Sequence, residues 1–439
     1  MSETTMDFPP AGQTVGQAAG IRRRAIISSA VGNFVELYDF MIYGFFAAQI
    51  AANFFPTGND TIDLLKAFAV YGVGFFMRPI GAIVIGAYGD RQGRKNALVL
   101  TVGLMAAATA LTGLIPSYSS IGIAAPLLLL LCRLAQGFST GGEWGGSAAF
   151  LVEFAPPGKR GLIGSVQQFS VGLALIAATV TAAVLNGALT KDAMVTWGWR
   201  IPFLIGFVLA PIGLYLRSKV SESPAFSRTV EKKQVATNPF ADALTTHRLP
   251  VLAAFGLSAI GTVGNYTYNI WLPAFASGQL KIPGSTAYTS ATVAAVVLTV
   301  LTPVMGWLSD KVGRKSILLV SAVAYGLLSF PLFSYLSGSP DGTKLMIVQS
   351  ISAVLLAMYA GPLCAILSEL FPTKVRFTAL SIGYGMSVTL FGGFAPFIAT
   401  WLTNATKNPV APAYFLVFAA IVSAGTLFFM KDRTNAPLD

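Results

Sequence analysis

Residues 86–95 read Gly-Ala-Tyr-Gly-Asp-Arg-Gln-Gly-Arg-Lys, and residues 306–315 repeat this pattern as Gly-Trp-Leu-Ser-Asp-Lys-Val-Gly-Arg-Lys. A second pattern, Glu-x-x-Pro-x-x-x-Arg, begins at residue 153 and recurs at residue 369. Two patterns that recur at nearly the same offset indicate that the chain consists of duplicated parallel repeats. The longest polar stretch, 218–248, separates the two halves.

The composition excludes most classes of soluble protein. Of the 439 residues, 54% are apolar and 11% are charged. Soluble domains carry about 25% charged residues, so this chain could not cover a water-exposed surface of ordinary size. Soluble enzymes, collagen-like chains and disordered proteins are therefore excluded. The net charge of +11 comes from small basic groups scattered between long apolar runs, which does not favour a nucleic-acid partner.

Long apolar runs predict the fold class. A helix needs about 20 mostly apolar residues to cross ~30 Å of hydrocarbon. Twelve runs meet this requirement, at residues 25–50, 64–88, 97–115, 122–152, 161–187, 200–217, 249–275, 287–308, 316–336, 344–368, 377–402 and 411–430. They lack the strict alternation of membrane β-strands. The sequence predicts an all-α membrane protein with twelve transmembrane helices in two pseudo-symmetric six-helix bundles.

The charge of the loops predicts the orientation in the membrane. If both termini are cytosolic, most of the 29 Lys and Arg residues lie on the cytosolic side, as the positive-inside rule requires. The predicted organisation is a cytosolic tail, a first bundle, a cytosolic linker, a second bundle and a second cytosolic tail, at residues 1–24, 25–217, 218–248, 249–430 and 431–439.

The repeated Gly-x-x-x-Asp-x-x-Gly-Arg-Lys loops resemble the signature of the major facilitator superfamily, and the resemblance covers the whole chain. Further motifs resemble its metabolite:proton symporter branch, which includes symporters for citrate, 2-oxoglutarate, shikimate and proline/betaine. These motifs are Gly32-Asn33-x-x-Glu36-x-x-Asp39-Phe40, Met77-Arg78-Pro79-Ile80-Gly81, Arg133-x-x-Gln136-Gly137-Phe138-Ser139-x-Gly141-Gly142-Glu143, Lys159-Arg160-Gly161 and Trp197-x-Trp199-Arg200.

The resemblance implies that the two bundles surround a central cavity and alternate between inward-open and outward-open states. It implies a cytosolic gate that contains Asp90, Arg94, Asp310 and Arg314. It also suggests coupling to protons and a monomeric protein. With the loop charges, it predicts a multi-pass protein of the cell inner membrane, in contact with the lipid bilayer.

Five ionisable side chains fall inside the predicted spans, all in the first half: Glu36, Asp39, Arg78, Arg133 and Glu143. A charge in the middle of a bilayer costs about 2.5–3.5 kcal/mol on insertion scales and therefore points to function. At a rise of about 1.5 Å per residue, three of them, Glu36, Arg78 and Arg133, reach the same depth.

These residue types favour the coupling of an organic anion to protons. The planar guanidinium groups of Arg78 and Arg133 suit a carboxylate. Glu36, Asp39 and Glu143 are candidate proton carriers because desolvation disfavours the anion of a carboxylic acid. Protonation of an acid would leave an arginine short of a partner, which the substrate can supply. The alternative is that these acids and arginines form permanent ion pairs that hold the bundle together.

Neutral polar groups complete the predicted substrate site. Gln136 shares a helical face with Arg133, and Gln167 lies on the fifth span. In the second half, Asn265, Tyr268 and Asn269 are three or four residues apart and can share a face. Two neighbouring aromatic residues, Tyr266 and Trp271, fit the interfacial belt of a membrane protein better than a binding site.

Other chemistries find no support in the sequence. The single histidine, His247, has no second His or Cys nearby, so we expect neither a metal site nor a cofactor. No ATPase motif and no nucleophile–base pair occurs, so the chain is not expected to be an enzyme. The leading prediction is proton-coupled uptake of a small carboxylate, most simply a di- or tricarboxylate such as citrate. The alternatives are proline or betaine symport, drug/proton antiport, and a metabolite sensor that does not transport.

Overall fold

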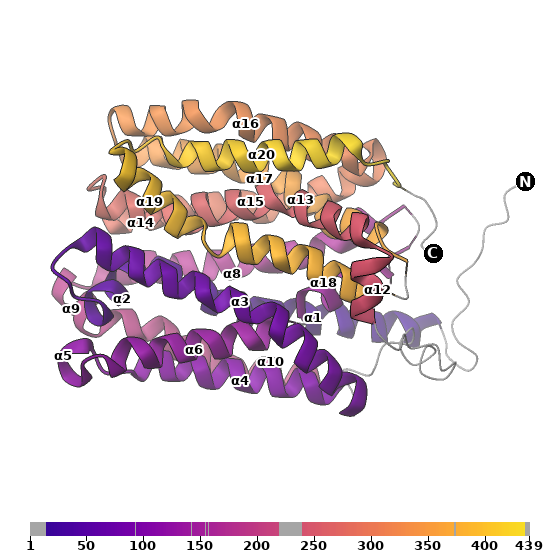
Figure 1. The fold of residues 1–439 in the computed structure, drawn as a ribbon, viewed down its shortest axis with the longest axis horizontal. Helices are drawn as coiled ribbons and strands as arrows, with labels where there is room; N and C mark the ends of the chain where they lie inside the picture. The colour runs from indigo at the N-terminus through magenta and orange to yellow at the C-terminus, as the bar shows by residue number, and fades with distance from the viewer. Residues whose placement is uncertain are drawn as a thin grey trace, which may run out of the picture.

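The computed structural model describes residues 15–92, 94–141, 143–153, 155–156, 158–218, 239–372 and 375–434. Within these ranges all regular structure is helical, which confirms the all-α class. Helices satisfy their backbone hydrogen bonds internally, so an apolar chain of this kind can be placed in lipid. The long helices run side by side along the longest axis of the molecule (Figure 1).

The first half contains α1 Val15–Phe45, α2 Ala47–Phe54, α3 Asp60–Gln92, α4 Arg94–Leu114, α5 Tyr118–Ile121, α6 Ala124–Thr140, α7 Glu143–Glu153, α8 Arg160–Ala188, α9 Lys191–Thr196, the 3₁₀ turn η1 Gly198–Arg200 and α10 Ile201–Ser218. The second half contains α12 Pro239–Thr245, α13 Arg248–Gly264, the π-helix η2 Asn265–Trp271, α14 Leu272–Gly278, α15 Gly284–Val312, α16 Arg314–Gly338, α17 Gly342–Glu369, α18 Arg376–Ser387, the π-helix η3 Val388–Gly392, α19 Ala395–Thr406 and α20 Pro412–Phe429.

Each predicted span coincides with an apolar helical segment. Among the described residues, eight helices are long and apolar enough to cross a membrane, and Ala30–Phe45 with Ala47–Phe54 forms one further, bent span. Three shorter apolar helices, Leu100–Leu114, Ala124–Thr140 and Gly198–Val208, occupy the remaining predicted positions.

Several spans that the sequence presents as continuous are interrupted. The first is bent by 65° between α1 and α2, and the fourth divides into α6 and α7 just after Gly141. The π-helices η2 and η3 interrupt the seventh and eleventh spans. Pro273 is the second residue after η2, and a proline cannot donate to the carbonyl four residues before it. Such π segments are frequent at functional sites.

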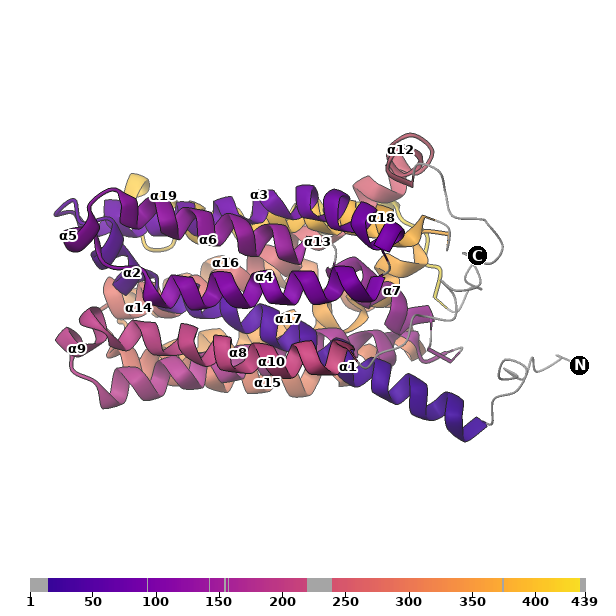
Figure 2. The same cartoon turned by 90° about the horizontal axis from the view of Figure 1, so that it is seen from below.

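The molecule has two distinct ends. We call the end where α8 begins and α17 ends the basic end, and the end where α2 ends and α15 begins the opposite end. Figure 2 shows α7, α12 and α18 toward the basic end, and α2, α5, α9 and α14 at the opposite end. In the predicted linker, residues 219–238 lie outside the described ranges, and α12 packs against α13 and α18.

Helices of the two halves meet along a surface that we call the seam. Here α8 packs along α15 and α17, and α7 packs along α18. Glycines let the backbones approach closely. A Cβ atom added to Gly161 would lie 2.4 Å from the carbonyl oxygen of Gly306, and one added to Gly361 would lie 2.6 Å from the Gly306 nitrogen. Near the opposite end, the Tyr288 hydroxyl donates a 2.5 Å hydrogen bond to the Phe45 carbonyl.

Candidate functional site

Arg133 is a fully buried charge on α6. Its side chain has 0% exposure, and its Nη2 lies 3.7 Å from Oδ2 of Asp39. Its guanidinium carbon lies 4.4 Å from the centre of the Tyr43 ring. None of its three nitrogens has a hydrogen-bond partner among the described residues. A guanidinium carries five N–H donors. The carboxylate of Asp39 balances the positive charge of Arg133, but the N–H donors of Arg133 remain available to a further acceptor.

Asp39 is held in place by α4 and α6. Nε2 of Gln136 donates a 2.5 Å hydrogen bond to Oδ2 of Asp39 and lies 3.0 Å from the Thr109 hydroxyl. Within the described part of the chain, Oδ1 of Asp39 has no partner. The structure therefore brings together three predicted residues, Asp39, Arg133 and Gln136, and leaves one carboxylate oxygen free to bind a further donor.

The positive charge of Arg78 on α3 lies against aromatic rings. Its guanidinium carbon lies 4.8 Å from the Phe40 ring centre and 4.2 Å from the Phe75 ring centre. Its Nε and Nη2 are buried, and neither has a hydrogen-bond partner in the described ranges. Aromatic faces attract cations and contribute about 0.5–2 kcal/mol per contact. The sequence left open whether these acids and arginines form ion pairs. The structure contains such a pair between Arg133 and Asp39, whereas Arg78 packs against aromatic rings.

Aromatic rings connect the two arginines. The Tyr43 and Tyr71 rings stack with centroids 5.6 Å apart, and the Tyr71 and Phe75 centroids are 5.4 Å apart. From the second half of the chain, the Tyr266 ring lies 6.2 Å from Tyr71 and 5.7 Å from Phe75. We call Phe40, Tyr43, Tyr71, Phe75 and Tyr266 the aromatic cluster. It brings both halves of the protein to Arg78.

The predicted interfacial role of Tyr266 and Trp271 is wrong. Their exposed fractions are 8% and 1%, so neither ring faces outward. Nε1 of Trp271 donates to the Thr400 hydroxyl at 2.9 Å, and Tyr266 belongs to the aromatic cluster. Both residues lie in η2. A π-helical turn changes the rotation per residue, so the faces of this span differ from those of a continuous α-helix.

The other predicted residues of the seventh span are divided by the same turn. Nδ2 of Asn269 donates to Oδ1 of Asn265 at 3.0 Å, so these two residues do share a face. Tyr268 does not join them, because its ring packs toward α16, 6.2 Å from Tyr325 and 5.6 Å from Phe333 between centroids. It lies in the core of the second half, away from the aromatic cluster.

Two contacts cross the seam beside the aromatic cluster. Gln167 on α8 is buried, and its Oε1 lies 3.6 Å from Sγ of Cys364 on α17. Trp144 on α7 and Tyr384 on α18 stack face to face, with centroids 3.4 Å apart and an angle of 7° between the rings. The backbone carbonyl of Trp144 also accepts a hydrogen bond from Nε2 of Gln167 at 3.4 Å.

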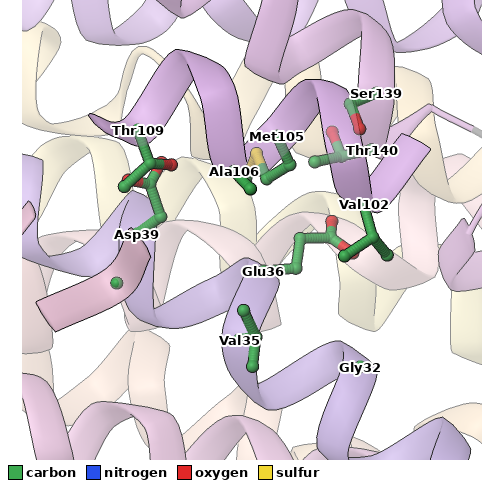
Figure 3. Close-up of a pocket in the computed structure, with 11 residues that line it drawn as sticks. Gly32, Val35, Glu36, Asp39, Val102, Met105, Ala106, Thr109, Ser139 and Thr140 are labelled. Atoms are coloured by element: carbon green, nitrogen blue, oxygen red, sulfur yellow. The ribbon is translucent and has the colours of Figure 1, made fainter. Parts of the chain in front are cut away.

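Glu36 lies one helical turn from Asp39, and both line a pocket enclosed by α1, α4, α6 and α10. Figure 3 shows the Asp39 carboxylate beside Thr109, and Glu36 directed into the same pocket. This places two of the three predicted proton carriers in one compartment. The side chains of Glu143, Asp90 and Arg94 lie outside the part of the chain that the structure describes.

A helix terminus and a carboxylate meet at the basic end of the seam. The carboxylate of Asp310, near the end of α15, accepts hydrogen bonds from the backbone nitrogens of Gly161 at 2.8 Å and Leu162 at 2.9 Å. These N–H groups open α8 and carry its positive dipole end, which favours an anion. Asp310 also lies 3.2 Å from Nη2 of Arg314. Of the two predicted gate residues of the second half, Asp310 therefore contacts the first half directly, and Arg314 pairs with Asp310.

The repeated Glu and Arg residues pair across the seam rather than within their own halves. Arg160 lies 3.3 Å from Glu369, and Arg376 lies 2.7 Å from Glu153. Glu369 is also 3.1 Å from Arg314. The sequence shows that the Glu-x-x-Pro-x-x-x-Arg pattern is repeated, but it does not predict that the Glu of one copy pairs with the Arg of the other. It also did not single out Trp144, whose stacking partner is distant in sequence.

Metal chemistry finds no support in the described residues, which contain no group of three or more His, Cys, Asp or Glu residues able to hold an ion.

Comparison with known proteins supports a transporter fold over the whole length. The family model for "Sugar (and other) transporter" matches residues 25–250, and the model for "Major Facilitator Superfamily" matches residues 254–438. A citrate-proton symporter of Klebsiella pneumoniae is 37% identical over 421 residues, which cover 96% of this chain and 94% of that protein. A proline/betaine transporter of Escherichia coli (strain K12) is 34% identical over 428 residues, which cover 95% of this chain and 85% of that protein.

Solved structures show the same fold. The xylose transporter from E. coli, in a partially occluded inward-open conformation, matches with a TM-score of 0.76 at 18% identity and covers 94% of this chain and 98% of that chain. A D-xylose-proton symporter matches with a TM-score of 0.76 at 18% identity and covers 95% of this chain and 99% of that chain.

Proposed function

The chain belongs to the metabolite:proton symporter branch of the major facilitator superfamily, and from this premise we propose that it takes up a small organic carboxylate together with protons. Residues 25–217 and 249–430 act as two six-helix bundles that rock about the seam. Both termini face the cytosol, so the basic end is the cytosolic end. The protein works as a monomer in the cell inner membrane.

One observation carries this proposal: Arg78 and Arg133 both have buried N–H donors without a hydrogen-bond partner in the described ranges. Buried polar groups are almost always hydrogen-bonded, and leaving a donor unsatisfied costs about 1–3 kcal/mol. A carboxylate can accept two parallel hydrogen bonds from one guanidinium. We assign Arg78 as the primary clamp because its guanidinium packs against the Phe40 and Phe75 rings, and its buried Nε and Nη2 have no hydrogen-bond partner in the described ranges. A di- or tricarboxylate can present a second carboxylate toward Arg133.

Proton coupling follows from the Arg133–Asp39 pair. While Asp39 is ionised, it compensates Arg133 at 3.7 Å, and an incoming anion is disfavoured. Protonation of Asp39 removes that compensation, and a substrate carboxylate can then replace it. The proton and the anion therefore stabilise each other's binding, which is the thermodynamic requirement for symport. Glu36 and Glu143 are further proton carriers in this proposal.

The remaining proposed site residues surround the clamp. Gln136 positions Asp39 through the 2.5 Å hydrogen bond. Gln167, Asn265 and Asn269 supply neutral hydrogen bonds from α8 and η2. Tyr268 is not part of the proposed substrate site, because its ring packs into the core of the second half.

We propose that the ion pairs at the basic end form the cytosolic gate. Asp310 and Arg314 act with the start of α8, and the duplicated Asp90 and Arg94 act in the same way in the first half. Opening toward the cytosol would break the Asp310 hydrogen bonds to Gly161 and Leu162. These contacts join the two halves, so they can exist only while this end is closed.

Symport of proline or betaine is the second candidate, and the aromatic cluster is the observation that favours it. Aromatic cages recognise quaternary ammonium groups, and a proline/betaine transporter is among the similar proteins. In this chain, however, the guanidinium of Arg78 already lies against two rings of the cluster. A second cation there would be repelled, so the site favours an anion over a zwitterion.

Exchange of labelled solute in proteoliposomes tests the function. We expect counterflow of citrate or another di- or tricarboxylate, and accumulation when an inward proton gradient is imposed. Counterflow of proline or betaine but not of carboxylates would support the second candidate. Binding without exchange would indicate a sensor and refute transport.

Two arginine variants test the clamp. Arg78→Ala and Arg133→Ala should each abolish exchange without loss of folded protein, because each removes a guanidinium that binds the substrate carboxylate, and loss of one partner of a buried, hydrogen-bonded charge pair in a complex costs roughly 2–5 kcal/mol. Arg200→Ala is the matched control. Arg200 donates to the carbonyls of Gly113 and Ile115 at 2.8 and 2.7 Å, away from the seam, so exchange should persist. Normal exchange by both seam variants would refute the carboxylate clamp.

A further inference from the structure

The pocket beside Glu36 and Asp39 lies within the first half of the chain and not at the seam. Its walls come from α1, α4, α6 and α10, and the described lining residues all precede residue 207. The aromatic cluster and Arg78, in contrast, adjoin helices of the second half. We refer to the pocket and to the region of the aromatic cluster as two compartments; Asp39 lines the pocket, and its partner Arg133 lies against the Tyr43 ring of the cluster.

The pocket has the size and the polarity to hold water. It offers about 20 Å³ to the centre of a water molecule, and a site needs roughly 10–15 Å³ by this measure to hold one. A buried water also needs two to four polar partners. Oδ1 of Asp39 has no partner in the described ranges, and the hydroxyls of Thr109, Ser139 and Thr140 line the same space together with Glu36.

The described charges around the pocket come from α1 and α6. Among the described lining residues, Glu36 and Asp39 on α1 are the only charged ones. Facing Asp39, α6 contributes Arg133 at 3.7 Å, whereas α4 contributes the neutral Thr109 and α10 contributes Gly206. Figure 3 shows the two carboxylates on the same side of α1, with Met105 and Ala106 of α4 facing them.

We propose that this pocket binds a water molecule that carries protons between Glu36 and Asp39, on a path separate from that of the substrate. This inference rests on the proposed symport and adds the proton's route to it. The water accepts a proton from the Asp39 carboxyl group and releases another to the Glu36 carboxylate. One O–H bond forms at each step as another breaks, and the water itself is unchanged.

The direction of this path follows from the order of the residues along α1. This helix starts at the basic end, so Glu36 lies nearer that end than Asp39. Asp39 contacts Arg133 and, through it, the aromatic cluster. A proton bound at Asp39 therefore senses the substrate through Arg133 and leaves toward the basic end through Glu36, without crossing the substrate cavity.

Filling the pocket tests the proposal. Ala106→Leu places a larger apolar side chain on the α4 wall without touching an ionisable group. The matched control is Ala107→Leu, the same change at the next residue, whose side chain is exposed. The assays are counterflow of labelled citrate, which needs no net proton movement, and accumulation driven by a proton gradient. If Ala106→Leu does not fold, Ala106→Val is the smaller replacement.

We expect Ala106→Leu to retain counterflow and lose gradient-driven accumulation, while Ala107→Leu retains both. Accumulation equal to that of the unmodified protein would overturn the water path. Loss of both activities in Ala106→Leu, with both retained in Ala107→Leu, would overturn the separation of the two compartments.

A second readout requires no substrate, so it separates this inference from the proposed function. Infrared difference spectra recorded over a pH series report the C=O band of protonated carboxyl groups, and Glu36→Gln and Asp39→Asn assign the bands. We expect the two carboxyl groups to titrate as a coupled pair, and Ala106→Leu to uncouple them. Independent titration in the unmodified protein would overturn the water bridge, even if citrate is transported. Coupled titration without any transport would overturn only the proposed function.

Discussion

Replacement of Asp310 by asparagine should open the basic end. The Asp310 carboxylate accepts two backbone hydrogen bonds from the start of α8, at 2.8 and 2.9 Å. A hydrogen bond to a charged group contributes about 1.5–3 kcal/mol. Asparagine keeps one acceptor oxygen but loses the charge, so the closed state should lose the equivalent of one such bond. At 1.4 kcal/mol per factor of ten, the equilibrium shifts toward the open state by roughly 10- to 150-fold.

Native Cys364 reports this opening. It is fully buried, and a Cβ atom on Gly164 of α8 would lie 3.3 Å from its Cβ, so separation of α8 from α17 exposes the thiol. In a Cys132→Ser background, the rate of alkylation by a membrane-impermeant maleimide from the basic side should rise by the same factor as the open population.

The control for this experiment removes a similar carboxylate that does not cross the seam. Asp341 caps α17 at the opposite end, and it accepts a 2.9 Å hydrogen bond from the backbone nitrogen of Lys344. Asp341→Asn should leave the alkylation rate unchanged. If Asp310→Asn alkylates no faster than Asp341→Asn, the Asp310 hydrogen bonds do not hold the basic end closed.

Three further changes test separate parts of the structure. Glu36→Gln should alter the pH dependence of accumulation and spare counterflow, as measured by uptake over a pH series; an unchanged profile would reassign the proton site. Trp144→Ala removes the stack on Tyr384, a contact worth about 0.5–1.5 kcal/mol, and should accelerate Cys364 alkylation, whereas Trp144→Phe should restore most of the protection. Gly306→Ala places a Cβ atom 2.6 Å from a carbonyl oxygen of α8 and should destabilise the protein by roughly 1–3 kcal/mol in thermal unfolding; Gly385→Ala, with open space around it, should not.

The sequence predicted the spans well because the length and polarity of an apolar run are local properties. It could not predict where a span breaks. Prolines lie just after η2 and η3, but Pro79 and Pro331 lie inside continuous helices, so a proline does not mark a break. The 65° bend after Phe45 has no proline next to it. The presence of π-helices changes which side chains share a face, and this explains the separation of Tyr268 from its predicted neighbours. The error for Trp271 has another cause, because the residue type alone does not show whether an aromatic ring faces lipid or the protein interior.

The sequence also predicted how far along each helix the charged residues lie, but not which way their side chains point. An equal distance from the helix ends predicted one layer for Arg78 and Arg133; in the structure both contact the aromatic cluster, Arg78 at Phe40 and Phe75 and Arg133 at Tyr43. The choice of Asp39 as the partner of Arg133, and of aromatic rings as the partners of Arg78, depends on how α1, α3 and α6 rotate about their axes. That rotation is set by tertiary packing, which a single sequence does not encode locally.

The crossed pairs at the basic end, Arg160 with Glu369 and Arg376 with Glu153, have the form of an isologous interface. In a twofold homodimer, residue i of one subunit contacts residue j of the other, and j contacts i in return. The two halves of this chain therefore meet as two copies of one ancestral subunit would. A chain divided within residues 219–238 should consequently reassemble from its two parts when both are produced in the same membrane, since the information for docking lies in the halves themselves.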